Sequence, residues 1–248
     1  MNNTEKFTGK AEAYSAARPS YPNALFEYLK SELGVDENTV FADIASGTGK
    51  FTQPLVKMGC TVYAVEPNDD MRGQAELLLS GYDHFISVNG SAENTGLPDD
   101  SVDYISAAQA FHWFDPQLFA AECKRILKPN GKVILLYNSR DEKAPLTVRL
   151  AEICRRLCPN FKGFSGGNSD EDLKSFFSGG FKKITFKNDL YYSRDSFVQR
   201  MLSSSYAPFE SAPNYSAFVN ELKSLFDEFA QNNILLMPNH TYLYIGTV

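Results

Sequence analysis

A glycine-rich turn and a carboxylate placed about twenty residues after it are the clearest chemical feature of this sequence. The segment VFADIASGTGK, residues 40–50, runs from an expected strand into an expected helix, which is where a backbone can approach a nucleotide closely. Glu66 ends the next expected strand, 21 residues after Ala45, where a carboxylate can accept hydrogen bonds from both hydroxyls of a ribose. The spacing therefore predicts a site for a ligand that carries a ribose.

The turn does not fit the phosphate-binding loop of nucleoside triphosphatases. That loop follows the pattern GxxxxGK[ST], and Lys50 does follow Gly49 here. However, Ile44 stands at the position of the first glycine, and Phe51 replaces the hydroxyl residue that would bind the metal ion. This alternative is therefore excluded.

The sequence fits a dinucleotide-binding turn better, but it lacks one of the small residues that such a turn requires. It requires a third small residue three positions after the second glycine, where the helix packs closely on the strand. Counted from Gly49 that position is Thr52, and counted from Gly47 it is Lys50. A nicotinamide-dependent oxidoreductase is therefore disfavoured, although it stays open as an alternative.

The elements that must position this turn alternate between short apolar strands and amphipathic helices. A helix is expected from Pro22 to about Gly34, and later helices are expected at 50–58, 68–79 and 116–127. Strands are expected at 39–44, 61–65, 85–88, 102–107 and 133–137. This alternation predicts βαβ units and a doubly wound α/β core with a parallel sheet that is covered on both faces.

After residue 137 the alternation gives way to a helix-rich region. Helices are expected at 146–157, 195–202 and 215–229, strands at 181–190 and 242–245, and a loop at 163–169. We expect one domain spanning 1–248. Its parts are an N-terminal arm at 1–34, a core at about 35–139 with strands near 181–190 and 240–247, and helical cap segments at about 140–178 and 191–236.

The composition of the chain disfavours several classes of protein. The 248 residues hold 24 Lys and Arg against 30 Asp and Glu, and the net charge of −6 disfavours a nucleic-acid binder. With 43% hydrophobic residues the chain is too apolar for disorder, and its four cysteines form no CxxC pair. The first residues form no apolar segment and no run is long enough to span a membrane, so a cytoplasmic protein without membrane contact is expected. His84 and His240 are isolated, and no metal site is expected.

Four ordered blocks resemble the motifs of the class I S-adenosylmethionine (SAM)-dependent methyltransferases. They are DIASGTG at 43–49, VEPN at 65–68 continuing to Met71, GSAE at 90–93 with LP at 97–98 and SVD at 101–103, and LKPNGK at 127–132. Two residues depart from the family pattern: Ala45 replaces the first glycine, and Ser91 replaces the acid that accepts from the adenine amino group in many members. The resemblance implies SAM as cofactor and a Rossmann-like seven-stranded sheet, mostly parallel with an antiparallel last strand, plus a helical cap.

Further segments resemble the small-molecule branch of this family that includes the trans-aconitate methyltransferases. They are Tyr14 with RPSYP at 18–22, QAFHWF at 109–114, and TYLYIG at 241–246. This resemblance implies a small-molecule methyl acceptor, with a carboxylate as one possibility. The reaction would be an in-line displacement in which the protein mostly supplies alignment. A SAM-binding subunit without catalytic activity is an alternative that the sequence leaves open.

The resemblance also implies the residues of the site. His112, after the fourth expected strand, is a candidate general base, although it is equally suited to lining the adenosine pocket. In the cap, several cations and tyrosines are candidates for holding an anionic substrate, although most such charges are solvated: Arg140, Lys143, Arg194, Arg200, Tyr191, Tyr192 and Tyr206. The residues expected to bind the cofactor are Tyr14, Arg18, Asp43, Ala45, Gly47, Gly49, Glu66, Pro67, Met71, Ser91, Ala92, Gln109 and Trp113.

Overall fold

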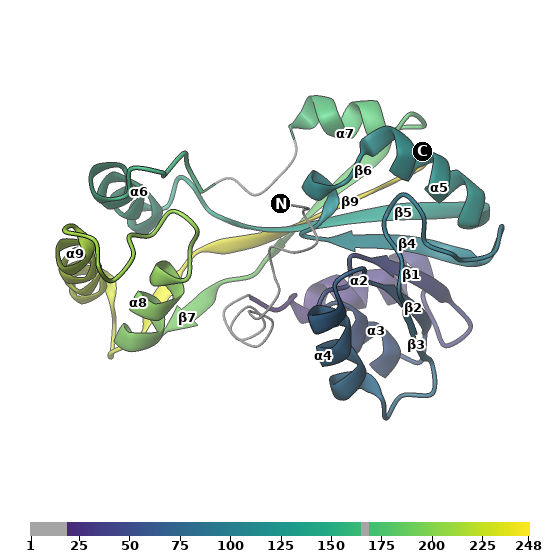
Figure 1. Cartoon of the computed structure of the whole chain (residues 1–248), viewed down its shortest axis with the longest axis horizontal. Coiled ribbons are helices and arrows are strands. Elements are labelled where there is room, and N and C mark those ends of the chain that lie inside the picture. Colours follow the sequence, from purple (N-terminus) through teal and green to yellow (C-terminus); the bar gives the residue numbers. More distant parts are fainter. Residues whose placement is uncertain (1–18, 165–168) are drawn as a thin grey trace. The chain divides into compact units, whose positions relative to one another are not determined.

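The elements that carry the predicted motifs follow one another in the expected order (Figure 1). The computed structural model describes residues 19–164 and 169–248, so Tyr14 and Arg18 lie outside the described residues. The first elements are α2 (Asn23–Leu33), β1 (Val40–Ile44), α3 (Thr52–Lys57), β2 (Thr61–Val65), α4 (Asp69–Leu79) and β3 (Phe85–Val88). They are followed by β4 (Val102–Ala108), the 3₁₀ helix η2 (Phe111–Trp113), α5 (Pro116–Ile126) and β5 (Leu127–Arg140).

The described chain divides into two compact units, which are considered separately below. The first unit holds the elements above as far as residue 137, together with residues 169–186 and 242–248. It therefore also contains α7 (Asp170–Phe176), β6 (Phe181–Lys187) up to residue 186, and the end of β9 (Asn239–Gly246). The second unit holds the described residues of 138–166 and 187–241.

Seven strands form the sheet in the order β3-β2-β1-β4-β5-β9-β6, mostly parallel with one antiparallel strand. The parallel register aligns Asp43 of β1 with Ala64 of β2 and with Ser106 of β4. The chain order reverses between β1 and β4, which is the point where ligands bind in open α/β sheets, outside the carboxyl ends of the strands. The expected doubly wound Rossmann-like fold is confirmed.

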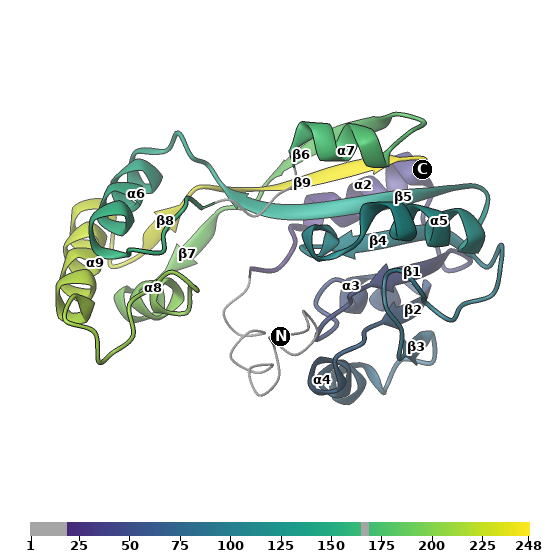
Figure 2. The same ribbon diagram turned by 45° about the horizontal axis from the view of Figure 1, so that its top comes forward.

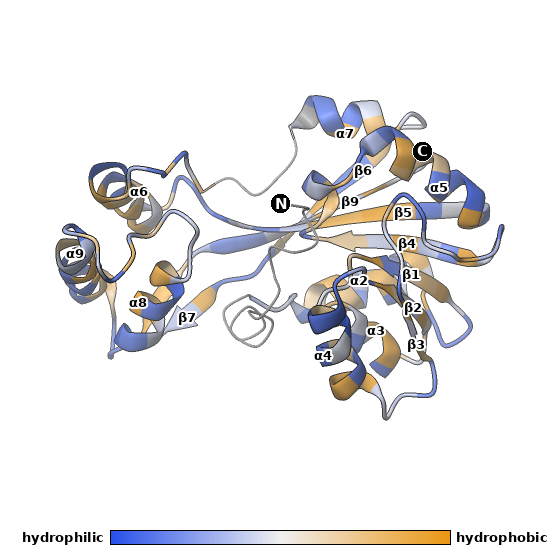
Figure 3. Ribbon diagram, in the orientation of Figure 1, coloured by the Kyte–Doolittle hydropathy of each residue, from blue (hydrophilic) through white to orange (hydrophobic). Residues whose placement is uncertain are grey.

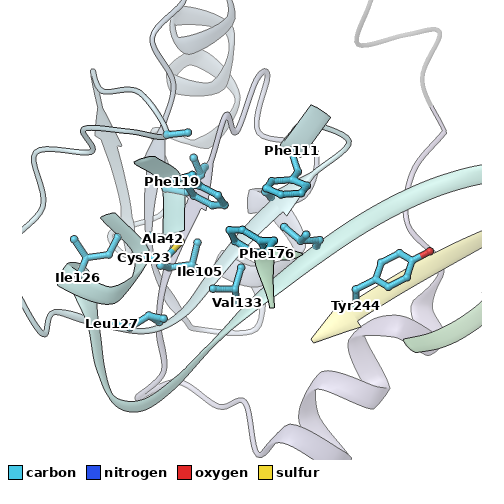
Figure 4. Packing of buried hydrophobic residues seen from close by; sticks show 14 of the residues in the cluster. Ala42, Ile105, Phe111, Phe119, Cys123, Ile126, Leu127, Val133, Phe176 and Tyr244 are labelled. Atoms are coloured by element: carbon cyan, nitrogen blue, oxygen red, sulfur yellow. The ribbon is translucent and has the colours of Figure 1, made fainter. Parts of the chain in front are cut away.

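Both faces of this sheet are buried, as alternate residues of single strands show. On β5, Val133 and Leu135 belong to one apolar cluster, and Ile134 and Leu136 belong to another. The first cluster includes residues of α5 and α7, and Figure 4 shows rings of both helices gathered with Phe111. The second includes residues of α2, α3 and α4. Figure 2 shows the long β5 beside its neighbours, and Figure 3 shows apolar stretches on β4 and β5.

Local capping fixes the ends of the helices that border the site. The side chain of Asn68 accepts a hydrogen bond from the Met71 amide and so begins α4 at the position that the sequence predicts. Asp115 accepts from two amides at the start of α5, and Pro116 occupies its first turn. Both caps lie just after residues expected to bind the cofactor.

The second unit packs three helices around one apolar cluster. These helices are α6 (Pro145–Leu157), α8 (Arg194–Leu202) and α9 (Tyr215–Phe229), and their apolar faces form the cluster with residues of β7 (Leu190–Tyr192) and β8 (Leu235–Met237). The two strands pair antiparallel, with Tyr191 opposite Leu236. No helix in the described ranges is long and apolar enough to cross a bilayer.

The elements differ from the expected ones in three places. β5 begins at Leu127, not Val133, because the turn residues 128–131 lie within a strand irregularity in which Asn130 has a φ of +70°. The strand expected at 181–190 is two strands, because the Asn188 amide between them bonds to Asn138 and Thr241. Neither α7 nor β8 was expected; a capping box from Ser169 begins the seven-residue α7.

Candidate functional site

The turn after β1 holds three alternate residues in the left-handed conformation. The φ angles are +52° at Ala45, +59° at Gly47 and +79° at Gly49. Within the turn, the Gly49 amide donates to the carbonyl of Ser46, and the Ser46 amide donates to the carbonyl of Val65 on β2. The departure at Ala45 is therefore accommodated, at the ~1–2 kcal/mol that a Cβ costs in this conformation. Among the described residues, the backbone of the turn lies open at Gly47, where an added Cβ would meet no atom within 4 Å.

Glu66 joins the turn to the end of β2. One carboxylate oxygen accepts from the Gly47 amide at 2.9 Å, and the other accepts from the Asn68 amide at 2.9 Å. The residue is 7% exposed. Burial raises the pKa of Glu66, while the two backbone amides and the charge of Arg72 lower it. An ionised carboxylate has about four acceptor positions, so two stay available for the hydroxyls of a ribose.

Asp43 is buried beneath the same turn. Its two oxygens accept from the hydroxyl of Thr52 at 2.7 Å and from the hydroxyl of Ser106 at 2.8 Å. Burial raises the pKa of Asp43 to about 6, the two hydroxyls oppose that rise, and the negative charge of Glu66 adds to it. Asp43 therefore ties β1 to α3 and to β4, which supports the turn from below.

Gly49 lies against α4, and a side chain there would collide with that helix. A Cβ at Gly49 would come within 2.8 Å of Leu79 Cδ1 and 3.4 Å of the Ala75 Cβ. The position thus combines a left-handed backbone, which favours glycine, with a close approach to the buried Leu79 side chain, which an added Cβ would displace. Gly47 differs in having the same backbone conformation but open space.

We expect Gly49→Ala to destabilise the protein by about 3 kcal/mol, from the left-handed cost and overpacking together. Thermal unfolding would show this as a fall of roughly 6–12 °C. Gly47→Ala is the matched control, and it should lose only about 1 kcal/mol because no neighbour is displaced. Equal losses in the two variants would contradict the close approach to Leu79.

The segment expected to contact adenine forms a tight turn and is hydrogen-bonded to α5. Ser91 is half-buried, its amide donates to the Asn94 carbonyl, and its hydroxyl accepts from the Asn94 amide at 3.2 Å. Ala92 is buried, 6% exposed. Both residues thus lie on a tight turn that begins directly after β3 and Gly90.

An ion pair on α5 between the buried Glu122 and the partly exposed Arg125 holds this segment, and no sequence pattern predicted it. Glu122 accepts from the amide of Thr95 at 2.8 Å and from its hydroxyl, and Arg125 pairs with Glu122 while donating to the carbonyl of Leu97. Burial raises the pKa of Glu122, but the hydrogen bonds from Arg125 and Thr95 prevail and lower it to about 2. Glu122 is therefore ionised at neutral pH.

The chain leaves β4 through another left-handed residue, Gln109. Gln109 has a φ of +60°, and its amide donates to the Leu136 carbonyl at 2.8 Å. Phe111 is buried and anchors η2 in the core, which leaves His112 and Trp113 exposed, the latter at 40%. β1 and β4 are parallel neighbours, so η2 follows the same edge of the sheet as the turn at Ala45.

Tyr137 lies beneath His112 and was missed as a candidate because it appears only as the end of an apolar strand. The two rings are 6.3 Å apart between centroids, and the Trp113 ring is 4.7 Å from that of His112. Burial raises the pKa of Tyr137, and a hydrogen bond with the backbone of His112 lowers it in part. Tyr137 therefore keeps its proton and supports the backbone of η2.

The carboxyl edge of the first unit thus brings together most of the expected residues. Asp43, Ala45, Gly47 and Gly49 come from β1 and its turn, and Glu66 ends β2. Pro67 and the buried Met71 follow Glu66, while Gln109, His112 and Trp113 follow β4. Ser91 and Ala92 follow β3, whereas Tyr14 and Arg18 lie outside the described residues. Within the described ranges, no three His, Cys, Asp or Glu residues are grouped as metal ligands.

Comparison with known proteins agrees with this arrangement. A family model described as a methyltransferase domain matches residues 42–135. An uncharacterized methyltransferase of Mycobacterium tuberculosis is 37% identical over 150 residues, which are 60% of this chain and 59% of that protein. The chain thus matches about three fifths of the length of such relatives. An uncharacterized methyltransferase of Schizosaccharomyces pombe is 30% identical over 196 residues, 77% of this chain and 74% of that protein.

Solved structures share the fold at low sequence identity. A candidate type II methyltransferase of Anaeromyxobacter dehalogenans has a TM-score of 0.66 at 21% identity, covering 93% of this chain and 97% of that one. A phosphoethanolamine N-methyltransferase of Haemonchus contortus, solved with phosphomonomethylethanolamine and S-adenosylhomocysteine, has a TM-score of 0.56 at 15% identity, covering 100% of this chain and 60% of that one. From its relatives and its fold, the chain belongs to the class I SAM-dependent methyltransferase family.

Proposed function

We propose that this protein transfers a methyl group from SAM to a small-molecule acceptor. The observation that carries the proposal is the Glu66 carboxylate, held by the amides of Gly47 and Asn68 beside a turn with three left-handed residues. A carboxylate at the end of the second strand, with two acceptor positions left, suits the two hydroxyls of a ribose. The turn beside it leaves its backbone open at Gly47, where the rest of the cofactor can approach.

The residues around this carboxylate divide the work of binding. Glu66 would hold the ribose, and the turn at Ser91 and Ala92 would border the adenine. Gly47 and the open turn would meet the methionyl part, and Trp113 would cover the ligand from η2. Tyr14 and Arg18 of the N-terminal arm are further candidates for the methionyl carboxylate or the acceptor. When bound, SAM supplies a methyl group activated by a positively charged sulfonium.

The remaining task of the chain is to align the acceptor and to take up its proton. Because the donor is already activated, alignment supplies the larger part of catalysis. His112 is exposed at the edge of the sheet, where an imidazole can act as a base toward an acceptor hydroxyl, amine or acid. The buried hydroxyl of Tyr137 keeps its proton and is therefore a supporting group, not a second base.

The acceptor class is proposed from resemblance. The segments at 18–22, 109–114 and 241–246 are similar to those of the small-molecule branch that includes the trans-aconitate methyltransferases. An acceptor that carries a carboxylate is therefore the first class to examine. The negative net charge of −6 favours such small molecules over nucleic acid.

Two other functions make different predictions. A nicotinamide oxidoreductase needs a small residue at Thr52, but the buried Thr52 hydroxyl donates to Asp43. A SAM-binding subunit without activity would bind the same cofactor but would methylate no acceptor.

The first experiment measures thermal unfolding with S-adenosylhomocysteine, SAM and NADH, each in large excess. A ligand at ~100 times its Kd adds about 2.7 kcal/mol to stability, which is roughly 5–10 °C for a chain of this size. We expect a rise with both sulfur compounds and none with NADH. A rise with NADH alone would refute the proposal in favour of the oxidoreductase, and no rise with either sulfur compound would refute cofactor binding.

A further inference from the structure

Arg140 in the second unit has no carboxylate partner among the described residues, unlike Arg149 and Arg156. Arg140, at the end of β5, is half-buried, and among the described residues no Asp or Glu lies within 4.0 Å of its guanidinium. Its Nε donates to Met237 Sδ at 3.3 Å and its Nη2 to Met201 Sδ at 3.8 Å. By contrast, Arg149 and Arg156 of the same unit both pair with glutamates.

Among the described residues, these contacts leave most N–H groups of the guanidinium without a protein acceptor. Arginine carries five N–H donors, and a thioether sulfur is a weak acceptor. The ring of Phe164 lies 4.5 Å from the guanidinium carbon, which supplies a cation–π contact but accepts no hydrogen bond of ordinary strength. A partly desolvated charge with such partners is costly unless an anion completes it.

The side chains around Arg140 are aromatic and include a second buried polar group, the hydroxyl of Tyr206. The hydroxyl of Tyr206 is buried beside the side chain of Ser204. The Phe161 ring is 4.9 Å from both the Tyr206 and the Phe164 ring. Burial raises the pKa of Tyr206, while the charge of Arg140 and the hydroxyl of Ser204 lower it in part. Tyr206 is therefore a protonated donor within the field of the guanidinium.

We infer that Arg140 and the aromatic residues beside it form a binding site for the carboxylate of a small organic acid with an apolar body. The planar guanidinium matches a carboxylate through two parallel hydrogen bonds. Phe161, Phe164 and the two methionines suit the apolar part of the acid, which inorganic phosphate lacks. Identifying this acid as the methyl acceptor rests on the proposed function, whereas its binding does not.

The test is calorimetric titration of the whole protein with phenylacetate and, separately, with its neutral analogue phenylacetamide. We expect phenylacetate to bind at least about tenfold more tightly than the amide, as the loss of one charged hydrogen bond requires. Arg140→Met should weaken phenylacetate by at least about tenfold, whereas Arg156→Gln, which removes an exposed paired arginine, should leave it unchanged. Arg140→Lys keeps the positive charge but not the planar guanidinium that donates two parallel hydrogen bonds. If the methionine variant does not fold, phenylacetate binding by the lysine variant tests the inference instead.

Three results would overturn the inference. They are no binding of phenylacetate in the millimolar range, equal binding of the amide, or equal weakening by Arg140→Met and Arg156→Gln. Tighter binding of inorganic phosphate would overturn the assigned ligand class. Titration of the same samples with S-adenosylhomocysteine separates the two proposals, because phenylacetate binding without cofactor binding refutes only the proposed function.

Discussion

Replacing Glu66 with alanine is expected to weaken binding of S-adenosylhomocysteine by two to four powers of ten. Two hydrogen bonds from ribose hydroxyls to a charged acceptor contribute about 1.5–3 kcal/mol each, and every 1.4 kcal/mol is tenfold in affinity. The alanine also removes the acceptor of the Gly47 and Asn68 amides, which loosens the turn itself. Titration calorimetry of the purified variant measures the loss directly.

The variant needs two companions to separate ribose binding from damage to the turn. Glu66→Gln keeps the size of the side chain but turns one oxygen into a donor, so we expect an intermediate loss of about tenfold or more. Glu76→Ala removes an exposed carboxylate of α4 that accepts from Ser87, and its affinity should match the original protein. A folded Glu66→Ala protein that binds within threefold of the original would refute the assignment of Glu66 to the ribose.

The parts of the site that the sequence predicted depend on local spacing. Asn68 caps α4, and α4 runs from Asp69 to Leu79, because a capping residue and its amide partner lie three residues apart. Glu66 meets the turn because parallel strands end at one edge, which fixes a carboxylate at the end of β2 beside the turn after β1. Such relations follow from periodicity and turn chemistry within a single βαβ unit.

The parts that the sequence did not predict depend on contacts between distant residues. Thr95 and Glu122 are 27 residues apart, and no pattern in either segment predicts the hydrogen bonds between them. Asn188, which interrupts the strand expected at 181–190, bonds to side chains 50 and 53 residues away. Tyr137 was assigned only to the sheet because a strand-forming aromatic residue looks the same whether or not its hydroxyl supports a site.

Two residues at the carboxyl edge of the sheet have strained backbones, and both local and distant contacts hold them in place. Ala45 and Gln109 are non-glycine residues with left-handed backbones, and they follow the adjacent strands β1 and β4. Such conformations cost about 1–3 kcal/mol and persist only where the surroundings impose them. Here Asp43 and Ser106 link the two strands by a buried hydrogen bond, and the Gln109 amide bonds to Leu136. The strands thus hold both turns at the point of chain reversal, where the cofactor is proposed to bind.

His112 is the residue whose replacement best separates chemistry from cofactor binding. Its side chain is exposed and its backbone is held by the buried Phe111 and by Tyr137, so alanine should leave the fold and η2 intact. If His112 takes the acceptor's proton, His112→Ala should lower kcat by about 10²–10⁴-fold. The Kd for S-adenosylhomocysteine should stay within threefold, because Glu66 and the turn at Gly47 are untouched.

The measurement uses deuterated SAM and mass spectrometry to find an acceptor among small organic acids, followed by steady-state rates of both proteins. His84→Ala is the matched control, since His84 is also exposed but precedes the edge strand β3, and its rate should not change. The pH dependence adds a second readout: loss of a base should remove the rise of kcat with pH, whereas lost alignment would lower kcat equally at every pH. Unchanged turnover in His112→Ala would show that alignment alone carries the reaction, and the base would then have to come from the acceptor or from solvent.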